Sequence, residues 1–108
     1  MSNRDFRSID PQELFGSVRS FWPETLPSDP QQQNAIYWSF EDSITDDWLS
    51  VGAWAFHQAM SDAHGRLTAA GRQLQSASEV TFEEFNQRMH DNLADEAWAE
   101  YRSYYKGL

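Results

Sequence analysis

Residues 49–77 read LSVGAWAFHQAMSDAHGRLTAAGRQLQSA and carry the most regular pattern in the chain. Their apolar side chains recur in alternating steps of four and three residues, which places them on one face of a helix. The pattern predicts a single helix of about 30 residues, roughly 45 Å long, or two helices broken near Gly65, where His64-Gly65 is typical of a helix C-terminus. The unbroken spacing favours one helix. Its face comprises Leu49, Ala53, Phe56, Met60, Ala63, Leu67, Ala70, Leu74 and Ala77.

Two large side chains of this stretch, Val51 and Trp54, lie outside that face. A helix whose apolar residues spread beyond one stripe is contacted on more than one side. We therefore expect the first half of the helix to have neighbours on two sides. The alanines that follow Phe56 should let a neighbouring helix approach closely.

Helix start signals precede this stretch twice. Residues 10–13 read DPQE, with an acid for the N-cap, a proline for the first helical position and a glutamate after it, and residues 29–32 read DPQQ. We expect one helix from 10 that stops at Pro23, a rigid connection over 23–29, and a second helix from 30. The β-forming residues 36–40 would also suit a strand, but the helical spacing of the apolar residues favours a helix.

Residues 81–84 read TFEE, a capping box that predicts the start of a last helix. The short connection 78–80 predicts that this helix folds back antiparallel on the preceding one. We therefore predict an all-α fold, a small bundle of four to five helices with a long C-terminal antiparallel helical hairpin. Residues 10–108 should form a single helical domain, and residues 1–9 a flexible N-terminal arm.

The composition restricts the classes of function. The chain has 108 residues, no cysteine and a net charge of −9, which excludes disulfides and thiolate chemistry and disfavours direct binding to nucleic acid or an anionic membrane. Its longest apolar run, residues 53–56, is far shorter than the roughly 20 residues of a membrane span. We expect a cytoplasmic protein that contacts neither membrane nor nucleic acid.

Catalytic and metal-binding motifs are missing from the sequence. It contains no Gly-rich phosphate loop, no serine elbow and no HExxH motif. His57 and His64 are two helical turns apart, which is too far for joint binding of one metal ion, and no Glu-x-x-His pair is present. We therefore expect no catalytic residue, no cofactor and no metal site, and conclude that the protein is not an enzyme.

The acidic residues form two clusters. Between Arg19 and Arg66 lie seven acids and no lysine or arginine, and a second cluster over 79–100 contains Arg88 as its only basic residue. Like charges four residues apart on a helix repel by about 0.2–0.5 kcal/mol, so folding alone would not select them. Such pairs are Glu79 with Glu83, Asp91 with Asp95, and Glu96 with Glu100.

These clusters predict a basic partner. Acids one helical turn apart are about 6 Å from each other, close to the spacing of successive phosphates. Such a surface attracts proteins that normally bind nucleic acid. The alternative is that the acids serve only to keep the protein soluble. Aromatic residues beyond those that the helix faces require are typical interface anchors; these are Trp38, Trp54, Trp98, Tyr104 and Tyr105. The predicted contacts are Glu41, Asp42, Asp46, Asp47, Glu84, Asp91 and Asp95, with Trp54 and Trp98.

In type, this profile is similar to small acidic inhibitors of phages and bacteria, namely anti-CRISPR and anti-restriction proteins that mimic nucleic acid and immunity proteins that plug a nuclease toxin. No motif makes the chain a member of one such family. We therefore expect a stoichiometric inhibitor of a basic, nucleic-acid-binding protein. The alternative is a structural or assembly subunit, or an adaptor, whose heptad face forms a homodimer or a hetero-oligomer through Phe56, Met60, Leu67 and Leu74.

Overall fold

The computed structural model describes residues 10–44 and 47–94, and the predicted N-terminal arm lies outside these ranges. Within them the chain is all-helical, which confirms the predicted fold class. The elements are α1 (Pro11–Arg19), α2 (Pro30–Ser43), α3 (Asp47–Ala69), the short 3-10 helix η2 (Ala77–Glu79) and α4 (Phe82–Ala94).

The predicted helix starts are confirmed by their hydrogen bonds. Asp10 and Asp29 are N-caps, and each accepts a bond at 3.1 Å from the backbone N–H two residues on, with a proline in the first turn. Residues 36–40 belong to α2, so the alternative of a strand there is wrong. The capping box of α4 is also formed, because the backbone N–H of Glu84 donates to Thr81 Oγ1 at 3.1 Å and that of Thr81 donates to Glu84 Oε1 at 2.8 Å.

The expected helix over 49–77 is wrong beyond Ala69. α3 ends at Ala69, and Gly71 follows with a φ of +78°. The N–H of Gly71 donates to the carbonyl of Thr68 at 2.9 Å, and that of Arg72 to the carbonyl of Leu67 at 2.7 Å. These bonds satisfy the last carbonyls of the helix in a left-handed cap that favours glycine. Gly65, in contrast, lies inside α3 without a break.

The loop over 70–81 keeps the apolar pattern without being helical. Leu74, Ala77 and Val80 are all buried, although Leu74 lies in chain without regular secondary structure and Ala77 in η2. The backbone N–H of Leu26, in the connection between α1 and α2, donates to the carbonyl of Gln75 at 2.7 Å. The two connecting segments therefore support each other and close one end of the core.

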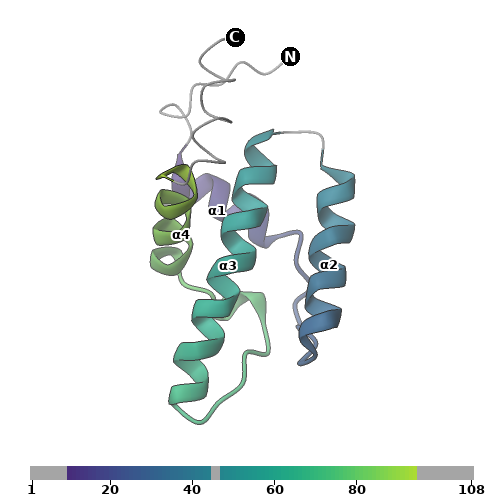
Figure 1. Ribbon diagram of the computed structural model, residues 1–108, viewed down its shortest axis with the longest axis vertical. Coiled ribbons are helices and arrows are strands. Elements are labelled where there is room, and N and C mark those ends of the chain that lie inside the picture. Colours follow the sequence, from purple (N-terminus) through teal and green to yellow (C-terminus); the bar gives the residue numbers. More distant parts are fainter. Residues whose placement is uncertain (1–9, 45–46, 95–108) are drawn as a thin grey trace.

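α3 lies at the centre of the molecule, with α2 and α4 on opposite sides and α1 crossing behind (Figure 1). The prediction of neighbours on two sides is confirmed: Phe56 of α3 contacts Phe15 of α1 with ring centroids 6.0 Å apart, and Trp54 of α3 contacts Tyr37 of α2 at 5.8 Å. α1 packs closely on α3 at Gly52, where a Cβ would lie 2.7 Å from Val18 Cγ2 and 3.2 Å from Leu14 Cδ1. A larger residue there would force these side chains to shift, so glycine permits the close approach.

α4 runs antiparallel to the second half of α3. Asp62 pairs with Arg88, and Arg66 pairs with Glu84. The partner residue numbers therefore decrease along α4 as they increase along α3, as in an antiparallel pair. The connection between them spans residues 70–81 and not the predicted 78–80. The described part of α4 ends at Ala94, and the C-terminal continuation that a long hairpin would need lies outside the described residues.

Candidate protein-binding surface

Three of the four arginines in the described ranges lie around α3, η2 and α4. Arg66, Arg72 and Arg88 all pair with acids around α3, η2 and α4, at distances of 2.5–3.0 Å. The remaining described arginine, Arg19, lies over the ring of Phe15 at 4.8 Å. Two acids of the second cluster, Glu79 and Glu84, are therefore paired with arginines from outside it, which spacing along the sequence did not reveal.

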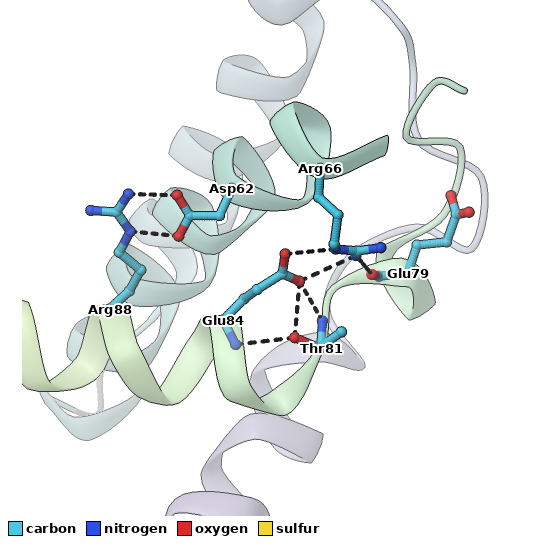
Figure 2. A network of polar contacts seen from close by, with 6 residues as sticks. All are labelled: Asp62, Arg66, Glu79, Thr81, Glu84 and Arg88. Atoms are coloured by element: carbon cyan, nitrogen blue, oxygen red, sulfur yellow. Dashed lines mark hydrogen bonds and ion pairs between the residues drawn. The ribbon is translucent and has the colours of Figure 1, made fainter. Parts of the chain in front are cut away.

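Glu84, a predicted partner contact, is occupied within the chain (Figure 2). Its carboxylate accepts bonds from Arg66 Nε at 3.0 Å and from the backbone N–H and hydroxyl of Thr81 at 2.8 and 3.0 Å. Partial burial raises the pKa of this carboxyl, but the bonds from Arg66 and Thr81 outweigh it and hold the pKa below its ordinary value. Glu84 therefore caps and anchors α4.

Glu79 has a similar structural role in the loop. Its carboxylate accepts bonds from the backbone N–H of Gln75 at 2.8 Å and from Arg72 at 2.6 Å, and its carbonyl accepts one from Arg66 at 2.7 Å. The Gln75 bond is the largest cause of its lowered pKa, with Arg72 contributing further. Because η2 is separate from α4, Glu79 and Glu83 are not the repelling pair on one helix that was expected.

Asp91, another predicted contact, is exposed on α4. Its carboxylate lies 3.9 Å from Arg88 Nη1 and accepts a bond at 3.0 Å from Gln87 Nε2. Arg88 itself makes two bonds to Asp62 across the helix interface. Asp91 is thus a peripheral member of the charge network between α3 and α4.

The α2 side has a different charge environment. Glu41 and Asp42 lie at the end of α2, and no ion pair joins either of them to a basic group of the described chain. The hydroxyl of Tyr37 donates to Glu41 Oε2 at 3.3 Å. Burial, followed by the charge of Glu41, raises the pKa of Tyr37 far above its ordinary value, so the phenol stays protonated as a donor.

Trp38 is the most exposed large apolar side chain in the described residues, at 58%. Its ring packs edge-on against Tyr37, with centroids 5.1 Å apart and an interplanar angle of 66°. Tyr37 in turn contacts Trp54 at 5.8 Å, so the structure brings two predicted contacts, Glu41 and Trp54, together around one tyrosine. We call Trp38, Glu41, Asp42 and Trp54, which lie around the buried Tyr37, the acidic aromatic surface.

A shallow groove of about 460 Å³ borders this surface along the other flank of α2. Phe21, 53% exposed, forms one wall and stacks on Phe40 with ring centroids 4.6 Å apart. α1 ends at Arg19, so Phe21 belongs to the turn that follows the helix. The groove is lined by Phe21, Ala35, Ile36, Ser39, Phe40 and Ser43.

The other predicted contacts are not placed by the structure. Asp46, Asp95 and Trp98 lie outside the described residues, and for Asp47, the first residue of α3, only the backbone is described. The heptad residues Phe56, Met60, Leu67 and Leu74 are at most 3% exposed and belong to the core of the chain itself. That face is therefore unavailable for the alternative of oligomerisation.

Among the described side chains, no group of three or more His, Asp or Glu residues is arranged to hold a metal ion. None of the helices in the described ranges combines the length and the apolar character that crossing a bilayer requires. Comparisons with protein-family models, with curated proteins and with solved structures gave no match.

Proposed function

We propose that the protein is a non-enzymatic, acidic binding protein that acts as a stoichiometric inhibitor of a basic, nucleic-acid-binding protein. The observation that carries this proposal is the acidic aromatic surface, where two carboxylates without arginine partners lie beside an exposed tryptophan. Exposed acids speed and orient association with a basic partner, and an aromatic anchor supplies apolar contact area.

The division of charge between the two sides supports this choice of surface. A folding requirement explains Asp62, Glu79 and Glu84, since each pairs with an arginine at the α3, η2 and α4 side. No equivalent requirement explains Asp42, which is exposed at the end of α2. Negative charge that does no structural work and lies beside exposed aromatic area is typical of a surface selected for a partner.

In this proposal, the acids of α2 take the positions that nucleic-acid phosphates normally occupy on the partner. A basic groove that normally holds a nucleic-acid strand would accept Glu41 and Asp42 in place of phosphates, with Trp38 in the position of a stacked base. Immunity proteins that plug a nuclease toxin use the same complementarity without imitating a strand. Both modes require a one-to-one complex and loss of the partner's binding to nucleic acid.

The test is capture of partners by the immobilised protein and by a Glu41→Gln, Asp42→Asn double variant. We expect the wild type to retain a basic protein at low salt, to release it as NaCl rises from about 50 to about 300 mM, and to block that protein's binding to DNA or RNA at one equivalent. Retention of the same protein by the variant at equal strength, or a captured protein whose nucleic-acid binding is unaffected, would refute the proposal.

The groove beside Phe21 gives the assembly alternative a surface in place of the heptad face. Apolar walls and an exposed phenylalanine are compatible with a second subunit. Sedimentation at two concentrations distinguishes the two functions, because a concentration-dependent dimer abolished by Phe21→Ser favours assembly. A monomer at both concentrations leaves inhibition as the better proposal.

A further inference from the structure

The helix face around Trp38 combines an aromatic ring with two carboxylates within one helical turn. Glu41 and Asp42 follow Trp38 by three and four residues in α2, and side chains at these spacings are about 5–6 Å apart at Cβ. Tyr37 supports the indole from one side through its edge-on contact at 5.1 Å. More than half of the Trp38 side chain remains accessible.

We propose that this face binds an arginine side chain of the partner, with its guanidinium stacked on Trp38 and hydrogen-bonded to Asp42 and Glu41. This inference rests on the proposed function and specifies the group that is recognised. Charge complementarity selects the occupant, because no lysine or arginine lies between Arg19 and Arg66 and no described basic group pairs with these two carboxylates.

Arginine fits the face better than lysine for geometric reasons. A guanidinium is planar, so it can stack on an indole while its N–H groups donate in the ring plane to carboxylates at the edge. A lysine ammonium is a compact, strongly hydrated charge that makes one of these contacts at a time. The side chain of Asp42 is suited to the second contact because it is exposed and unpaired in the described chain.

Two components of this interaction, a guanidinium over an aromatic ring and a guanidinium paired with a carboxylate, both occur elsewhere in the chain. The guanidinium of Arg19 lies over the Phe15 ring at 4.8 Å, and that of Arg88 makes two hydrogen bonds to the Asp62 carboxylate. At the Trp38 face the ring and the carboxylates are both present, whereas the guanidinium is not supplied by the described chain. A partner would provide it.

The test compares two short synthetic peptides of equal length and charge, one of alternating glycine and arginine and one of alternating glycine and lysine. Each is titrated into the wild-type protein while the indole N–H resonance of Trp38 is followed by NMR. We expect the arginine peptide to bind about two- to fivefold more tightly. Trp38→Leu should remove this preference, Asp42→Asn should weaken both peptides, and Glu83→Gln on α4 should change neither.

Equal affinity for the two peptides, a preference that survives Trp38→Leu, or no binding of either peptide would overturn the inference. Equal affinities that both fall in Asp42→Asn would overturn arginine recognition while the acidic surface, and with it the proposed function, stands. The proposed function fails on a separate result, namely if capture of the partner by the immobilised protein is insensitive both to salt and to the Glu41→Gln, Asp42→Asn substitutions. Circular dichroism confirms that each exposed-site variant is folded.

Discussion

Arg66 of α3 donates from Nε to Glu84 Oε2 at 3.0 Å, and the same carboxylate caps α4 through Thr81 (Figure 2). One glutamate thus joins two helices and fixes the start of the second. An acid that looked available for a partner is committed to the fold. This pairing removes Glu84 from the predicted contacts, whereas Glu41 and Asp42 on α2 have no arginine partner in the described chain.

Neutralising Glu84 should destabilise the protein in a pH-dependent way. The pKa of Glu84 is lowered from 4.5 in the folded state, so its contribution is complete above pH 4.5 and disappears as the pH falls through the folded value. We expect Glu84→Gln to lower the melting temperature at pH 7 and to differ less from wild type in acid. The matched control is Glu83→Gln at the exposed neighbouring position; equal effects of both substitutions would contradict the role given to Glu84.

Gly52 and Gly65 should respond in opposite directions to alanine. A Cβ at Gly52 would lie 2.7 Å from Val18 Cγ2, while one at Gly65 would meet no atom within 4 Å. Overpacking costs about 1–3 kcal/mol, which exceeds the roughly 1 kcal/mol that alanine gains over glycine in a helix. Urea unfolding should therefore show Gly52→Ala destabilised and Gly65→Ala stabilised by up to about 1 kcal/mol. Stabilisation by both would mean that α1 does not cross α3 at Gly52.

Gly71 should be intolerant of a side chain for a different reason. Its φ of +78° lies in the left-handed region, and no atom within 4 Å would obstruct a Cβ. The backbone cost for an L residue there is about 1–2 kcal/mol, so Gly71→Ala should lower the unfolding free energy by about this amount. An unchanged or raised stability in the same urea experiment would show that α3 does not end in this cap.

His57 should make stability depend on pH near neutrality. Burial lowers its pKa from 6.5, because the half-buried ring stacks on Tyr37 at 4.6 Å and cannot be hydrated freely when charged. The unfolded chain therefore takes up the proton first, and stability falls as the pH drops below 6.5. We expect His57→Gln to flatten this part of the stability profile and His64→Gln, at an exposed position, to leave it unchanged. Profiles of equal slope in wild type and His57→Gln would refute the assignment.

Local signals in the sequence predicted the helix starts well. An N-cap such as Asp10, Asp29 or Thr81 acts within its own first turn, so neighbouring residues contain the information. The end of α3 was predicted wrongly because Leu74 and Ala77 stay buried in the loop. Apolar spacing alone does not distinguish a continuing helix from a loop that packs the same residues inward.

The candidate surface was only partly predictable for a related reason. Glu41, Asp42 and Trp54 were expected contacts from charge and aromatic content. The loss of Glu84 from the set depends on Arg66, a residue 18 positions away that only the packing of α3 on α4 brings near. Trp38, which the sequence placed among the aromatic residues beyond those that the helix faces require, is exposed at 58%.

The most direct measurement is the dissociation constant of the captured basic partner from two variants that remove the same amount of charge. Glu41→Gln with Asp42→Asn alters the acidic aromatic surface, whereas Glu13→Gln with Glu83→Gln alters exposed acids on α1 and α4. We predict that the first pair weakens binding by about tenfold or more and reduces its salt dependence, and that the second pair changes it by less than about twofold. Equal weakening by both pairs would contradict a specific surface on α2 and would attribute binding to net charge alone.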